Sequence, residues 1–205
     1  MDTVAIVEWA RKAMAGKRGD EMERGYRYWH GVRTGNLAVW LGTTLGLDSA
    51  TLERLYVAGV LHDVGKSDGQ GKEPHGPKGG RIVRAQLKRW LNATERGSVA
   101  AMVEHHYDRP RSKWYAGKPT PRWPTDILVL QDADVLDHYG AMRFASALYW
   151  ARADGVPPSD FFRAYWAHPD ERALRAESMR SLNFPASRVE LRRRFAETRR
   201  LMRQA

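Results

Sequence analysis

The feature that most constrains the fold is the stretch Val57-Ala58-Gly59-Val60-Leu61-His62-Asp63-Val64-Gly65-Lys66, in which an apolar run ends in a histidine and an aspartate. Apolar residues before this pair recur at helical spacing, so the sequence predicts a buried helix over residues 49–63. Gly65 ends that helix and leaves His62 and Asp63 in its last turn. An ionised carboxylate there must be paired or bound to a metal, because burying it unpaired costs many kcal/mol. His62 and Asp63 are therefore poorly suited to a hydrophobic core and well suited to bind a metal ion.

The rest of the chain also shows helical periodicity, and hairpin signals between alternating runs are absent from the sequence. Further helices are expected over about residues 2–15, 20–45, 78–92, 94–106, 124–150, 159–180 (as one or two helices) and 186–204. Loops are expected at 66–77 and 107–123. The predicted fold class is all-α. The 205 residues predict a single domain over 1–205, with a core at about 20–152 and a helical C-terminal extension at about 156–205.

Composition narrows the chemistry. The chain contains no cysteine, which fits a cytoplasmic protein and leaves only nitrogen and oxygen ligands for a metal. No apolar run approaches the roughly 20 residues of a membrane span, so no membrane partner is expected. The net charge of +10 fits either a solvated basic surface or attraction to anionic partners such as nucleotides and nucleic acid. The oligomeric state has no signature in the sequence.

The candidate metal ligands are histidines and aspartates that end or interrupt apolar helical stretches. Four of them, from three helices, can enclose one metal ion: His30, His62, Asp63 and Asp134. Asp63 can bridge to a second ion that is held also by His75, His105 and His106. Neutral imidazole and carboxylate are usual ligands of Mn, Fe, Co, Ni and Zn. The sequence therefore predicts a divalent transition-metal site, with two ions in this arrangement.

Some of these assignments have alternatives. Asp134 and Asp137 share a helix face, so both remain candidates for the last carboxylate, whereas Asp132 points elsewhere. His106 is either a ligand, a partner of a ligand or a substrate contact. The isolated histidines His138 and His168 are expected to have structural roles.

The ordered set of candidate ligands resembles the HD superfamily of metal-dependent phosphohydrolases over about residues 26–150. The motifs that carry the resemblance are Trp29-His30-Gly31-Val32-Arg33, Leu61-His62-Asp63-Val64-Gly65-Lys66, His75-Gly76-Pro77-Lys78-Gly79, Glu104-His105-His106 and Asp132-Ala133-Asp134-Val135-Leu136-Asp137. The resemblance implies an HD-domain helical bundle with the metal site in its core. It also implies that Asp134 is the ligand of the last motif.

The additional histidines are similar to those of the two-metal branches, which include the HD-GYP cyclic dinucleotide phosphodiesterases and the CRISPR-associated HD nucleases. The chain lacks Gly-Tyr-Pro after His105-His106 and reads Tyr107-Asp108-Arg109-Pro110 there, which argues against cyclic-di-GMP hydrolysis. The di-iron HD oxygenases share a nearly identical ligand set, so the ligands alone do not separate hydrolase from oxygenase.

The predicted activity is hydrolysis of phosphate ester bonds of a nucleotide or related phosphorylated small molecule, by metal-activated hydroxide. Alternatives are a di-iron HD-type oxygenase, a nuclease acting on single-stranded nucleic acid and a non-catalytic nucleotide-binding module. Asp63 would be the bridging catalytic carboxylate. Lys66, just after the His-Asp pair, and Arg33, one turn after His30, are the expected phosphate contacts. Arg109 and Arg111, in the loop after His105-His106, are expected to bind substrate.

Overall fold

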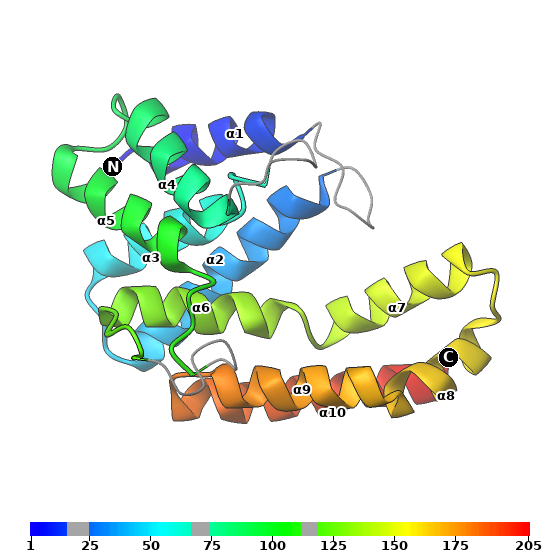
Figure 1. The fold of residues 1–205 in the computed structure, drawn as a ribbon. Coiled ribbons are helices and arrows are strands. Elements are labelled where there is room, and N and C mark those ends of the chain that lie inside the picture. The colour runs from blue at the N-terminus through cyan, green and yellow to red at the C-terminus, as the bar shows by residue number, and fades with distance from the viewer. Residues whose placement is uncertain (16–24, 67–73, 112–118) are drawn as a thin grey trace. The chain divides into compact units, whose positions relative to one another are not determined.

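The structure, a computed structural model, describes residues 1–15, 25–66, 74–111 and 119–205, and within these ranges it contains ten α-helices and no strand (Figure 1). The prediction of an all-α protein is therefore confirmed. Parts of the predicted helix at 20–45 and of the predicted loops at 66–77 and 107–123 lie outside the described residues. The helices are α1 Thr3–Met14, α2 Tyr26–Thr44, α3 Ser49–Leu61, α4 His75–Gln86, α5 Ala93–His105, α6 Thr125–Asp137, α7 Ala141–Ala153, α8 Pro158–Ala167, α9 Pro169–Ser181 and α10 Pro185–Gln204.

Local sequence signals explain where several helices begin. The Asp48 side chain accepts a hydrogen bond from the backbone N–H of Thr51 at 2.9 Å and caps the start of α3. Asn92 and Glu95 form a reciprocal capping box at the start of α5, one residue earlier than the predicted start. Such caps satisfy backbone N–H groups that have no partner within the helix.

Other predicted boundaries are wrong. The predicted helix at 124–150 is two helices, α6 and α7, because the chain turns at Gly140, whose φ is +78°. The segment 159–180, in contrast, was predicted as one or two helices and forms two, since Pro169 cannot donate the backbone hydrogen bond that would continue α8. α4 begins at His75 and ends at Gln86, earlier at both ends than predicted. Trp29 of α2, a large apolar residue, is 58% exposed.

The chain forms two compact units. The first comprises Met1–Arg109 and Arg122–Asp134, and it contains α1 to α5 with most of α6. The second comprises Pro110–Pro121 and Val135–Ala205, and it contains the end of α6 with α7 to α10. The predicted limits of a core and a C-terminal extension stay a prediction. Among the described helices, none is both long and apolar enough to cross a membrane.

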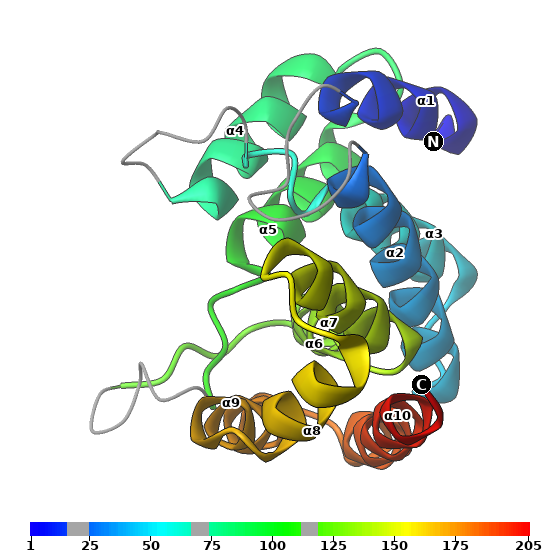
Figure 2. The ribbon, with the colours of Figure 1, turned by 90° about the vertical axis from the view of Figure 1, so that its right-hand side faces the viewer.

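In the first unit, α2 and α3 lie side by side at a separation that only glycine permits (Figures 1 and 2). A Cβ added at Gly31 would lie 2.4 Å from the carbonyl oxygen of Val60, and one at Gly59 would lie 2.3 Å from the Cα of Gly35. These distances are too short for any side chain. The glycines therefore let the two backbones touch, and this contact brings His30 of α2 next to His62 at the end of α3.

A similar contact joins the His-Asp turn, α4 and α5. A Cβ at Gly65 would lie 1.9 Å from the carbonyl oxygen of His75, and one at Gly76 would lie 2.3 Å from the carbonyl oxygen of Glu104. The start of α4 is thereby held against both the turn that carries Asp63 and the last turn of α5. Four segments that are distant in sequence thus present their polar residues to one place.

In the second unit, α7, α8 and α10 pack around Ala147, Phe162 and Met202. A buried ion pair lies nearby, in which Arg143 donates to Glu171 at 2.9 Å. The hydroxyl of Tyr165 donates to the same carboxylate oxygen at 2.7 Å. These hydrogen bonds replace the bonds to water that the carboxylate loses on burial, and so reduce the free-energy cost of burying it.

Candidate metal centre

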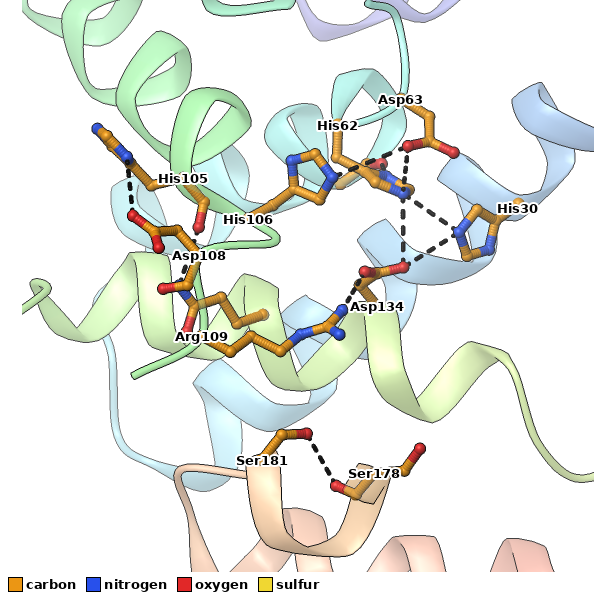
Figure 3. A network of polar contacts seen from close by, with 12 residues as sticks. His30, His62, Asp63, His105, His106, Asp108, Arg109, Asp134, Ser178 and Ser181 are labelled. Atoms are coloured by element: carbon orange, nitrogen blue, oxygen red, sulfur yellow. Dashed lines mark hydrogen bonds and ion pairs between the residues drawn. The ribbon is translucent and has the colours of Figure 1, made fainter. Parts of the chain in front are cut away.

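His30 and His62 face each other in the interior of the first unit (Figure 3). Their Nε2 atoms are 3.2 Å apart, and both side chains are buried. The Nδ1 of His62 lies 2.7 Å from the carbonyl oxygen of Gly59. Because a carbonyl oxygen only accepts, Nδ1 of His62 carries the proton, and in the neutral ring the lone pair of Nε2 points toward His30. The backbone of α3 therefore fixes the tautomer that a metal ligand requires.

Asp134 of α6 completes a first group of three. Its Oδ1 lies 3.2 Å from Nε2 of His30 and 3.6 Å from Nε2 of His62. The three ligand atoms all lie within 4.8 Å of one another, and all three residues are buried. Helix spacing left Asp134 and Asp137 open and the family resemblance implied Asp134; the structure brings Asp134 to the histidines, while Asp137 lies in the second unit.

The two oxygens of Asp63 have different surroundings. Oδ2 accepts from the ammonium of Lys66 at 2.9 Å and from the guanidinium of Arg27 at 3.3 Å. Oδ1 is buried and has no hydrogen-bond partner among the described residues. It faces Nε2 of His62 at 3.5 Å and Nε2 of His106 at 3.8 Å. An unsatisfied buried carboxylate oxygen among imidazole nitrogens is the environment that a cation would complete.

His75 and His106 form a second facing pair. Their Nε2 atoms are 3.0 Å apart, and Nε2 of His75 lies 3.7 Å from Oδ1 of Asp63. Nδ1 of His106 donates to the carbonyl oxygen of Val103 at 2.7 Å, so its Nε2 also presents a lone pair to the cluster. His62, Asp63 and His106 form a second group with ligand atoms within 4.8 Å.

Burial favours the neutral form of three histidines of the cluster. It lowers the pKa of His62, lowers that of His106 to about 3 and lowers that of His75 to about 4, to which the nearby charge of Lys66 also contributes. Burial alone would raise the pKa of Asp63, but electrostatic interactions with His62 and with the ammonium of Lys66 outweigh burial and hold that pKa well below its usual range. Near neutral pH the cluster thus offers neutral imidazoles and an ionised carboxylate, the forms that bind divalent metals.

His105 does not join the cluster, and its assignment as a ligand requires correction. Its ring stacks on Trp123 with the centroids 4.1 Å apart, and its Nδ1 lies 3.9 Å from a carboxylate oxygen of Asp108. Figure 3 shows the side chain pointing away from His106. Successive residues of a helix point about 100° apart, and in the last turn of α5 it is His106 that faces the cluster.

The predicted phosphate contacts differ in position. Arg109 donates to Oδ2 of Asp134, so this residue, like Lys66, touches a candidate ligand (Figure 3). The guanidinium of Arg33 lies 5.9 Å from the ring centre of Tyr26 and is partly exposed. Arg111 is exposed and belongs to the second unit.

Sequence reasoning missed Arg27, which the structure places against Asp63. Arg27 stands one turn before His30, at a spacing that puts both side chains on one face of α2. This spacing, together with the glycines that bring the helices together, could have indicated from the sequence that Arg27 lies near the candidate ligands.

The fold and the cluster define a class of protein: an all-helical protein with a buried centre of histidines and aspartates suited to a divalent cation. A family model described as HD domain matches residues 27–139, more than half of the 205-residue chain. The chain therefore belongs to the HD domain family, and with it to a class of metal-dependent hydrolases. This confirms the resemblance read from the motifs.

Solved structures show the same fold at low sequence identity. YpgQ of Bacillus subtilis, in a crystal structure with ADP, is 18% identical with a TM-score of 0.61, and the match covers 99% of this chain and 95% of that chain. An HD-superfamily hydrolase of Bacillus thuringiensis is 17% identical with a TM-score of 0.65, covering 98% and 93%. A protein of Lactobacillus plantarum is 22% identical with a TM-score of 0.59, covering 98% and 93%. Among curated proteins, none shows significant similarity to the sequence.

Proposed function

We propose that this protein is a metal-dependent phosphohydrolase that cleaves a phosphate ester of a nucleotide or a related small molecule. The observation that carries the proposal is the position of Asp63, whose unpartnered Oδ1 lies among three imidazole nitrogens while its Oδ2 is held by two cationic side chains. A carboxylate in this position is suited to bridge two metal ions.

The proposed ligands fall into two groups that share Asp63. His30, His62 and Asp134 would hold one ion, and His75 with His106 would hold the second. A divalent cation at such a centre acts as a Lewis acid toward a phosphate oxygen and lowers the pKa of water. Burial lowers the pKa of His62, His75 and His106, so their lone pairs are available for binding near neutral pH.

The cationic residues beside the ligands suit a phosphate substrate. The side chain of Lys66 is 35% exposed and that of Arg109 is 23% exposed, so both reach solvent while contacting a buried carboxylate. From this position each can hold its carboxylate and also meet an incoming anion. Charge-assisted hydrogen bonds from such groups orient a phosphate and offset negative charge that builds up as the ester is attacked.

Two observations support a nucleotide or related phosphate as the substrate. The chain carries a net charge of +10, which favours the approach of polyanions. The structurally similar YpgQ of Bacillus subtilis was crystallised with ADP, a nucleotide. A cytoplasmic location, in keeping with the absence of cysteine, remains part of the proposal.

Metal analysis and a screen of phosphatase and phosphodiesterase substrates with Mn, Co, Ni and Mg test the proposal. We expect metal-dependent release of phosphate or cleavage of a diester, and loss of that activity in His62→Ala and in Asp63→Asn. Circular dichroism establishes that each variant is folded. Activity that persists unchanged in both variants would contradict the proposed centre.

The same preparation distinguishes the alternatives that share these ligands. Oxygen consumption by the iron-loaded protein, without hydrolysis of any phosphate ester, would favour an oxygenase. Cleavage of single-stranded DNA or RNA without turnover of mononucleotides would favour a nuclease. Nucleotide binding without turnover under any of the metals would favour a binding module.

A further inference from the structure

A pocket lies in the second unit, between α8 and the C-terminal end of α10. Its volume is about 360 Å³, and every residue that lines it belongs to the range Ser159–Ala205. None of the lining residues is a candidate metal ligand. Pockets of a few hundred Å³ with an apolar floor and a few polar groups are the usual form of small-molecule sites.

The floor of this pocket is apolar and well packed. Phe162 and Met202, exposed by 2% and 7%, form part of the core between α8 and α10. Trp166 forms a wall, and the guanidinium of Arg175 lies 4.0 Å from the centre of its indole. Stacking of Arg175 on this ring limits its rotation. The pocket thus offers a fixed aromatic surface next to a buried apolar base.

The rim of the pocket is cationic. Arg163 of α8 and Arg199 and Arg203 of α10 line it, whereas no aspartate or glutamate does so among the described residues. Arg199 and Arg203 are four residues apart and therefore project from the same face of α10. In the described part of the chain neither takes part in an ion pair or hydrogen bond, while Arg163 has a distant one to Asp160 at 3.9 Å.

We propose that this pocket binds an aromatic phosphate, with the ring against Trp166 and the phosphate between the arginines of α10. Planar guanidinium groups bind phosphate oxygens through paired hydrogen bonds, and a flat ring stacks on an indole. Guanidinium groups beside an apolar floor match an anion with an apolar body. The pocket is a binding site separate from the metal centre, and the proposal does not depend on the reaction catalysed there.

Titration with AMP, followed by NMR of the tryptophan indole N–H groups, tests the site directly. The titration is done in EDTA, which prevents phosphate from binding to metal at the other centre. Trp166→Phe identifies the Trp166 signal. We expect a saturable shift of that signal with AMP and a much weaker response to adenosine, which lacks the phosphate.

Paired variants locate the binding and provide the control. Arg199→Ala combined with Arg203→Ala should weaken AMP binding by about tenfold or more, because two charge-assisted contacts are lost. Arg192→Ala combined with Arg200→Ala removes the same charge from exposed positions of α10 that do not line the pocket, and it should change affinity by less than about twofold. The absence of a Trp166 shift, equal effects of the two double variants, or equal binding of adenosine and AMP would each overturn the proposal.

Discussion

At the scale of single residues, the direction of each side chain decides what the histidines do. His105 and His106 are adjacent, yet only His106 faces Asp63 and His75, while His105 stacks on Trp123. The motif alone does not distinguish them, because both belong to the same helical turn and have the same chemistry. The difference depends on which face of α5 packs against α4.

The two adjacent histidines form a matched pair for mutation. We expect His106→Ala to reduce metal content or to lower metal affinity at least tenfold, because one nitrogen ligand is lost. His105→Ala should leave metal binding within about twofold of the unaltered protein, because this ring lies outside the cluster. Isothermal titration with Mn²⁺ and elemental analysis measure both. Equal losses in the two variants would show that the assignment of inward and outward rings is incorrect.

Arg109 was predicted to contact substrate, but its hydrogen bond to Oδ2 of Asp134 also makes it a positioning residue. Holding Oδ2 directs Oδ1 toward His30, so Arg109→Ala should lower metal affinity by about 10- to 100-fold, as is usual when a partner of a ligand is removed. Mn²⁺ titration without substrate measures this effect. An unchanged metal affinity with a raised KM would instead indicate that Arg109 acts only on substrate.

At the scale of elements, glycines set the distances between helices. Gly31, Gly35 and Gly59 allow α2 and α3 to touch, and Gly65 and Gly76 hold the start of α4 against its neighbours. The centre therefore depends on backbone contacts as much as on its ligands. Helical periodicity predicted the elements themselves, but not the glycine contacts, because periodicity says which face is buried and not how closely two faces approach.

Gly59→Ala tests the contact between α2 and α3. The added methyl group would lie 2.3 Å from the Cα of Gly35, so we expect destabilisation of about 1–3 kcal/mol and weaker metal binding, since His30 and His62 would move apart. Gly97→Ala in α5 is the control, because nothing lies within 4 Å of its added Cβ and alanine favours the helix by up to about 1 kcal/mol. Urea unfolding and Mn²⁺ titration measure both effects. A Gly59→Ala variant as stable as Gly97→Ala would contradict the close contact.

At the scale of the whole molecule, the two units have cores of different kinds. The first is built around the polar centre, whereas the second contains an apolar cluster and the buried Arg143–Glu171 pair. The helix α6 contributes residues to both units, since its residues up to Asp134 belong to the first and those from Val135 to the second. A continuous helix is a reason to expect that the units unfold together, as the predicted single domain requires.

Glu171→Ala tests this coupling. The substitution leaves the buried Arg143 without its carboxylate, and removing one member of a buried pair costs about 3–5 kcal/mol. We expect the thermal unfolding of the entire protein to shift downward in one transition, and metal bound at the first unit to be released in the same step. Arg143→Met combined with Glu171→Leu should recover part of the loss, because the buried charge of Arg143 is removed together with its partner, while Arg175, which lies 3.9 Å from Glu171, still loses a carboxylate. Two separate transitions, with metal retained through the first, would show that the units are independent.

The sequence by itself determined the helical class, most helix starts, the family and the order of the ligand motifs. These follow from the spacing of apolar residues, from caps such as Asp48, and from the chemistry of histidine and aspartate next to apolar runs. Only the tertiary structure decided that His106 and not His105 faces inward and that Arg27 lies against Asp63. The physical reason is that local spacing determines the face of a helix that a residue occupies, whereas contacts between helices determine which faces meet.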